Sequence, residues 1–119
     1  MHGLPADLDL SFLVGAVLVR VEQSAHQPAV RLYFDGDVWV GIEATFRVAT
    51  EMRDVMLGPS DDAATALAGF IGDSIQTAHG QTDGTLTINF SAAGLLELYD
   101  SSTEFECYQI HYGGSVLPV

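Results

Sequence analysis

Lysine is absent from this chain of 119 residues, and cysteine, asparagine and tryptophan each occur only once. Without lysine the chain has no Schiff-base nucleophile and no phosphate loop of the lysine-containing type, which excludes several large enzyme classes. The lone Cys107 cannot form a disulfide within the chain, and the first residues lack the charged start and apolar core of a signal peptide. We therefore expect a cytoplasmic protein, and the composition is typical of a GC-rich bacterial genome.

Basic residues are also scarce, with four arginines against sixteen aspartates and glutamates, so the formal net charge is −12. Such a chain has no basic face to neutralise phosphates, which excludes nucleic acid as a partner. No apolar run approaches the roughly 18 residues that a membrane span requires, so no membrane partner is expected. The hydrophobic content of 48% indicates that residues 1–119 fold as a single domain.

Charged residues of either sign make up only 17% of the chain, compared with about 25% in typical domains. A small domain places a large fraction of its residues at the surface, so some apolar surface is left exposed in a monomer. We therefore expect a homo-oligomer, most simply a two-fold dimer, in which a second copy covers that surface.

Alternation of apolar and polar residues predicts a series of short β-strands. Asp35-Gly36 lies between two of them and predicts a tight antiparallel hairpin. Two short helices are predicted, over 10–14 with capping by Asp9 or Ser11, and over 63–71 with capping by the acidic and serine residues at 60–62. Residues 52–59 lack the alternation and predict a connection. The predicted strands are 16–23, 30–34, 38–42, 46–50, 74–78, 85–90, 94–99 and 106–112.

The order of these elements repeats along the chain. Residues 10–15 (LSFLVG) match 67–72 (LAGFIG), and the apolar positions of 30–34 match those of 86–90. We interpret the chain as two pseudo-repeats, about residues 10–50 and 67–112, each with a short helix and three strands; chance similarity between amphipathic hairpins is the alternative. The predicted fold is mainly β (α+β), an antiparallel curled sheet, barrel or sandwich in which the two halves pack together.

The histidines are scattered, and no pair of cysteines is present. Cys107 and His111 would lie on one face of a strand, but four residues of strand span about 13 Å, too far for both to bind one metal ion. His2, His26 and His79 form no zinc-binding motif with them. We therefore assign no metal site, no cofactor and no catalytic residue.

Acidic residues offer a second kind of candidate. Asp35 and Asp37 flank a glycine in a predicted turn, and turn formation explains both, because the oxygens that a calcium-binding loop needs at later positions are missing. A carboxylate dyad for a small enzyme or ligand-binding domain could come from several glutamates. These are Glu43, Glu97, Glu104 and Glu106.

Trp39 alternates with apolar neighbours and is therefore predicted to face away from the core. Tyr33 and Arg31 have the same alternation on the preceding strand, and tryptophan, tyrosine and arginine dominate binding hot spots. We predict that these three residues form an interface. The alternative is that both faces of the sheet are covered within the monomer.

Three segments carry a resemblance to a known group of proteins: 13–15 before a strand, 32–36 with the strand that follows, and 104–110 with Gly113-Gly114. With these segments the chain resembles a family of small bacterial proteins of unknown function, some of which look like immunity proteins of toxin systems. The resemblance covers residues 10–117, rests on turn and hydrophobic positions, and implies no catalytic residue.

The acidic charge and small size favour a non-enzymatic binding protein. We expect its partner to be a basic protein, in the form of an immunity protein that neutralises a basic toxin by electrostatic complementarity. The alternative is a small enzyme or ligand-binding β domain that uses surface or cleft carboxylates. A third interpretation is that the charge only keeps an apolar, oligomeric domain soluble.

Overall fold

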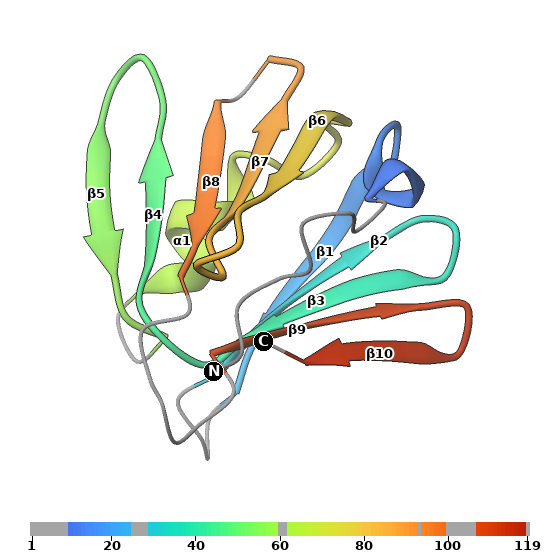
Figure 1. Ribbon diagram of the computed structural model, residues 1–119. Helices are drawn as coiled ribbons and strands as arrows, with labels where there is room; N and C mark the ends of the chain where they lie inside the picture. Colours follow the sequence, from blue (N-terminus) through green and yellow to red (C-terminus); the bar gives the residue numbers. More distant parts are fainter. Residues whose placement is uncertain (1–9, 25–28, 60–61, 93, 100–106, 119) are drawn as a thin grey trace.

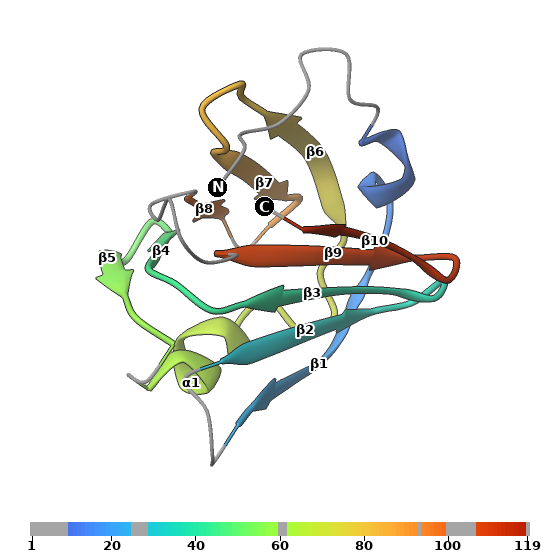
Figure 2. The ribbon, with the colours of Figure 1, turned by 60° about the horizontal axis from the view of Figure 1, so that its bottom comes forward.

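The computed structural model of the chain describes residues 10–24, 29–59, 62–92, 94–99 and 107–118, and within them ten strands form two five-stranded antiparallel sheets (Figure 1). Figure 2 shows the strands of the first sheet side by side. The first sheet contains, in spatial order, β1 (Leu18–Gln23), β2 (Val30–Phe34), β3 (Val38–Ile42), β9 (Tyr108–Tyr112) and β10 (Ser115–Pro118). The second contains β5 (Asp54–Leu57), β4 (Phe46–Ala49), β8 (Leu95–Leu98), β7 (Leu86–Phe90) and β6 (Ile75–Gly80).

Each half of the chain contributes strands to both sheets. After β3 the chain leaves the first sheet, and β4 and β5 join the second sheet beside β8. After β8 the chain returns, and β9 and β10 join the first sheet beside β3. Neither sheet can therefore be completed by one half alone, which agrees with the prediction that the halves pack together.

Within the described residues, one isolated bridge, between Val17 and Ser74, links the two sheets. Gly15 and Gly72 lie beside this bridge with φ angles of 88° and 91°, in the left-handed region that glycine occupies without strain. Beyond the bridge the sheets diverge, and in the described part of the chain they do not close into a barrel (Figure 1). The barrel alternative is therefore wrong, and two antiparallel sheets that share one core are observed.

The helical content is smaller than predicted. The first predicted helix is a 3-10 turn, η1 (Ser11–Leu13), and the second is α1 (Ala63–Ala68), which ends three residues early. Leu10 and Asp62 occupy the N-cap positions without any side-chain capping bond, so the predicted capping by Asp62 is wrong; Asp9, Ser60 and Asp61 lie outside the described residues.

A residue distant in sequence supports the start of α1 instead. The side-chain oxygen of Gln23, at the end of β1, accepts a hydrogen bond from the Ala64 N–H at 3.2 Å. The side-chain nitrogen of Gln23 donates to the carbonyl oxygen of Pro59 at 2.9 Å. Because these partners lie about 40 positions apart, local sequence signals could not indicate them.

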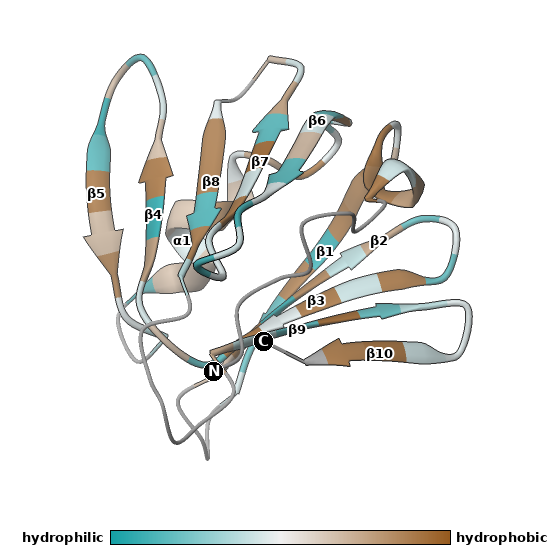
Figure 3. Ribbon diagram, viewed as in Figure 1, coloured by the Kyte–Doolittle hydropathy of each residue, from teal (hydrophilic) through white to brown (hydrophobic). Residues whose placement is uncertain are grey.

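Apolar and polar residues alternate along the strands, as the hydropathy colouring shows (Figure 3), and the apolar residues are buried in one core. The rings of Phe34 and Phe90 stack across this core with centroids 6.4 Å apart. Tyr108 is fully buried, and its hydroxyl donates to the carbonyl oxygen of Gly84 at 2.7 Å. No helix in the described residues is long and apolar enough to cross a membrane. The largest buried side chains are Tyr108, Phe46, Phe70, Leu13, Leu18, Leu32, Ile42, Leu67, Ile75, Leu86, Ile88 and Leu96.

Two strands occur where none was predicted. Residues 52–59 were predicted to be a connection, but 54–57 form β5, which pairs with β4 because Val55 and Leu57 pack against the core. The strand β10 follows a turn in which Gly113 and Gly114 have φ angles of 53° and 83°. A Gly-Gly pair is a signal for a two-residue hairpin, and it could have indicated β10.

The predicted hairpin at Asp35-Gly36 is confirmed, with β2 and β3 pairing from Phe34 opposite Val38. The left-handed residues are Gly36 and Asp37, with φ angles of 75° and 61°. Asp35 has a different role, since its carboxylate accepts a hydrogen bond from the Val17 N–H at 2.9 Å. This contact ties the hairpin to the bridge between the sheets.

Candidate functional site

The outer face of the first sheet carries a row of stacked rings and guanidinium groups, which we call the aromatic ladder: Arg20, Tyr33, Trp39, His111 and Arg31. The Arg20 guanidinium lies 4.2 Å from the centre of the Tyr33 ring, and the Tyr33 and Trp39 ring centres are 6.0 Å apart. The Trp39 and His111 rings stack at 3.4 Å with an interplanar angle of 8°. Neighbouring strands supply these rings, so they are cross-strand pairs.

Strand alternation places Trp39 on this face, because Val38 and Val40 on either side of it are buried in the core. His111 stacks on the indole from β9, and Arg31 lies 4.8 Å from the indole centre on β2, so the ring is held between the two strands that flank β3. A Cβ atom on Gly41 would lie only 3.2 Å from Cζ3 of Trp39. The missing side chain at Gly41 therefore gives the indole its room.

Arg31 is a fixed positive charge beside the indole. A hydrogen bond with Tyr33 raises the pKa of Arg31, with smaller contributions from the nearby carboxylates of Glu22 and Glu43. Arginine is protonated at all ordinary pH values in any case. The guanidinium therefore stays charged and is occupied by its contacts with Tyr33 and Trp39.

A pocket of about 320 Å³ adjoins the aromatic ladder. Its walls come from β1, β2, β3 and β9 and include two exposed carboxylates, the indole of Trp39 and the polar side chain of Gln109. A smaller hollow of about 160 Å³ adjoins Trp39 and His111. Trp39 thus borders both hollows. The residues that line the larger pocket include Glu22, Arg31, Trp39, Gly41, Glu43 and Gln109.

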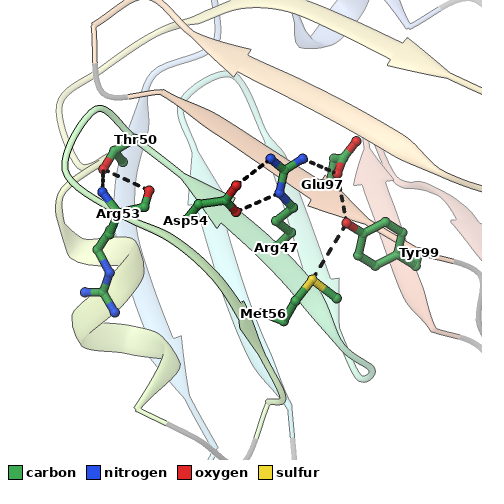
Figure 4. Close-up of polar contacts among 7 residues, drawn as sticks. All are labelled: Arg47, Thr50, Arg53, Asp54, Met56, Glu97 and Tyr99. Atoms are coloured by element: carbon green, nitrogen blue, oxygen red, sulfur yellow. Dashed lines mark hydrogen bonds and ion pairs between the residues drawn. The ribbon is translucent and has the colours of Figure 1, made fainter.

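A separate ionic cluster lies on the second sheet (Figure 4). Arg47 on β4 donates two hydrogen bonds of 2.8 Å to the carboxylate of Asp54 and one of 3.0 Å to Glu97. The hydroxyl of Tyr99 donates to the same oxygen of Glu97 at 2.8 Å. This network satisfies both carboxylates.

The network changes the acidity of its members. Hydrogen bonds from Tyr99 and then Arg47 lower the pKa of Glu97, and Arg47 lowers the pKa of Asp54. Burial, followed by the hydrogen bond to Glu97, raises the pKa of Tyr99 to about 12. Glu97 is therefore held ionised near neutral pH, which does not suit it to act as a general acid.

The structure places the predicted interface residues Trp39, Tyr33 and Arg31 together on one face, and their role as an interface stays a prediction. The stacking of His111 on Trp39 was not predicted, because the pairing of β9 with β3 leaves no local signal in the sequence.

The four candidate glutamates are not brought together as a dyad within the described residues. Glu43 follows β3 and borders the pocket of the first sheet, whereas Glu97 belongs to the ionic cluster of the second sheet. Glu104 and Glu106 lie outside the described residues. The four predicted glutamates therefore supply no dyad within the part of the chain that the structure describes.

The histidines and the single cysteine are the residue types most suited to bind a transition metal. Cys107 is buried and forms no disulfide, His111 stacks on Trp39, and His79 is exposed on β6. His2 and His26 lie outside the described residues. Among the residues that the structure does describe, no group of three or more histidine, cysteine, aspartate or glutamate side chains could hold a metal ion.

These features define a two-sheet antiparallel β domain with a row of stacked aromatic residues on one outer face. Residues 13–114 match DUF6188, a family of unknown function. Because the match covers more than half of the chain, the protein belongs to this family. No curated protein and no solved structure matches the chain.

Proposed function

We propose that this protein is a non-enzymatic binding domain that holds a basic partner protein on the aromatic ladder. The observation that carries the proposal is the Trp39 indole, fixed between His111 and Arg31 on an outer sheet face. Tryptophan, tyrosine and arginine are the residue types that contribute most to binding free energy. Side chains that are already packed lose little conformational entropy when a partner binds, which favours affinity.

The net charge of −12 supports a basic partner, because opposite charge accelerates association and disfavours acidic competitors. A narrower form of the proposal is an immunity protein that neutralises a basic toxin in the bacterial cytoplasm. Small size and acidic charge support that form. A basic toxin encoded by a neighbouring gene is the expected partner in that case.

The experiment is affinity capture from the native host and capture of the purified product of a neighbouring gene. We expect a basic protein to bind the wild type and to elute as the salt concentration rises. Tyr33→Asp, on the aromatic ladder, should abolish capture, whereas Gln76→Asp, at an exposed position of β6 in the second sheet, should retain it. Equal capture by both variants, or no salt-sensitive partner, would refute the proposal.

The alternative, a small ligand-binding domain, has one supporting observation, the pocket of about 320 Å³ with two carboxylates in its wall. A thermal-shift screen with metabolites distinguishes this alternative, because a ligand that binds only the folded state raises the unfolding temperature. Protein capture on the aromatic ladder without any metabolite shift would favour the binding-domain proposal.

We also propose that the halves about 10–50 and 67–112 are pseudo-repeats. The hydrogen bonds beside the Val17–Ser74 bridge occur in related pairs, which supports this view. The Gly15 N–H donates to the carbonyl oxygen of Ile75 at 2.8 Å, and the Gly72 N–H donates to that of Leu18 at 2.7 Å. Donors and acceptors both differ by 57 positions (72 − 15 and 75 − 18).

A homodimer is our final proposal on assembly. Val14, Val19 and Ile71 are large apolar residues with exposed fractions of 50%, 54% and 46%. Each of them adjoins a residue that takes part in the hydrogen bonds between the sheets. A second copy that covered this apolar surface would account for a low charged fraction in a small domain.

A further inference from the structure

The pocket beside the aromatic ladder contains a carboxylate that forms no ion pair within the described residues. Glu43 lines this pocket, is exposed, and forms no ion pair with any residue that the structure describes. Glu22, the second carboxylate of the pocket, forms an ion pair of 3.1 Å with Arg20. Both side chains are exposed, so this ion pair is weak. A cation that entered the pocket would therefore meet one available carboxylate and one weakly engaged carboxylate.

Trp39 gives the same pocket an aromatic wall. The indole is fixed by His111 and Arg31, and its Cζ3 atom lies on the side of Gly41, which also lines the pocket. The pocket thus offers carboxylate acceptors and a fixed aromatic surface to one occupant.

The size of the pocket limits that occupant. A volume of about 320 Å³ lies at the lower end of the 300 to 1,000 Å³ that ligand pockets usually occupy. Gly41 contributes no side chain to the pocket and leaves its base open. The space suits a single side chain better than a large organic molecule.

We propose that the pocket receives an arginine side chain of the basic partner protein. Glu43, with Glu22, holds the guanidinium group, and the apolar stem of the arginine lies against the Trp39 ring. The planar guanidinium can form two parallel hydrogen bonds with a carboxylate, which the compact ammonium group of lysine cannot. Arg31 lines the same pocket and lies near both carboxylates, but its guanidinium lies over Trp39 and forms no ion pair with either of them. This inference rests on the proposed function and names the chemistry that the partner brings.

The probe is N-acetyl-arginine amide, titrated into the ¹⁵N-labelled protein at low salt. Trp39 is the only tryptophan, so its indole gives a single N–H signal that reports directly on the pocket. We expect this signal to move with arginine amide and not with N-acetyl-citrulline amide, which has the same shape without the charge. The affinity should fall by about tenfold or more in Glu43→Gln, because the variant loses the charge-assisted hydrogen bonds.

The matched control is Glu51→Gln, which removes the same charge from an exposed residue between β4 and β5. It should leave the titration unchanged. The proposed arginine pocket would be refuted if arginine and citrulline amides bound equally. It would also be refuted if Glu43→Gln and Glu51→Gln lost the same affinity for arginine amide. If Tyr33→Asp abolishes partner capture while Glu43→Gln neither weakens capture nor alters the arginine titration, the proposed function stands and only the arginine pocket is wrong.

Discussion

At the scale of single residues, Gly15 and Gly72 show how much of the fold depends on two backbone angles. Both have left-handed φ angles, and a Cβ atom added to either would contact no other residue within 4 Å. Alanine at each position should therefore act only through backbone strain, at a cost of about 1 kcal/mol. If the halves are pseudo-repeats, urea denaturation should give equal losses for Gly15→Ala and Gly72→Ala.

Gly69→Ala is the control for this pair. Gly69 follows α1 with a φ angle of −64° and has open space around it, so alanine fits there without strain. We expect its unfolding free energy to stay level or to rise by a few tenths of a kcal/mol. A large loss in only one of the two left-handed positions would contradict equivalent roles for them.

Residue alternation was sufficient to place Trp39, Tyr33 and Arg31 on one face, because the side-chain period of a strand is two. Alternation could not indicate that His111 covers the indole. That contact depends on β9 pairing with β3, and the two strands are separated by β4 to β8 in the sequence. The sequence of one strand therefore predicts which face a residue lies on, but not which residue of a neighbouring strand contacts it.

At the scale of elements, the ionic cluster on β4, β5 and β8 should make stability depend on pH. The ordinary pKa values of Asp54 and Glu97 are 3.8 and 4.5, and the folded protein lowers both. A lowered carboxyl pKa stabilises the fold above the unfolded value, and that contribution disappears as the pH falls through the folded value. Arg47→Met should lower the urea midpoint at pH 7, and the difference from the wild type should shrink below about pH 4.

Arg53→Met provides the matched control for Arg47→Met. Arg53 belongs to the same hairpin, but its exposed side chain points away from the cluster and forms no ion pair with a described residue (Figure 4). The variant removes the same charge and should leave the urea midpoint unchanged at both pH values. A difference between Arg47→Met and the wild type that stays constant from pH 7 to pH 3 would show that the carboxylates are not responsible.

The same hairpin shows where element prediction stopped. β5 is only four residues long, and Val55 and Leu57 supply just two inward positions, too few for a distinct period. The hydroxyl oxygen of Thr50 organises the turn before β5 by accepting hydrogen bonds from the N–H groups of Met52 and Arg53 at 3.2 Å. Longer strands such as β2 and β7 were predicted because three alternating apolar residues mark each of them.

At the scale of the whole molecule, the sequence did not predict that each half of the chain contributes strands to both sheets. Strand propensity is local, whereas the choice of β8 rather than β3 as the neighbour of β4 depends on how the complete core is filled. Composition nevertheless indicated that apolar surface would remain. The exposed Val14, Val19 and Ile71 agree with that expectation, and the dimer that should cover them stays a prediction.

The dimer proposal is tested by light scattering at micromolar concentration, where we expect the mass of two chains. Val19→Asp and Ile71→Asp should each raise the dissociation constant on the order of 100-fold, because a desolvated, unpaired carboxylate costs several kcal/mol. Met52→Asp is the control, since Met52 is 92% exposed in the turn between β4 and β5, away from the bridge. A monomer mass for the wild type would refute the dimer. If only Met52→Asp dissociated the dimer, the interface would lie at the hairpin of β4 and β5 instead. Because each aspartate also adds negative charge, high salt should remove any small general charge effect seen in Met52→Asp, and it should restore the dimer of the two patch variants only in part.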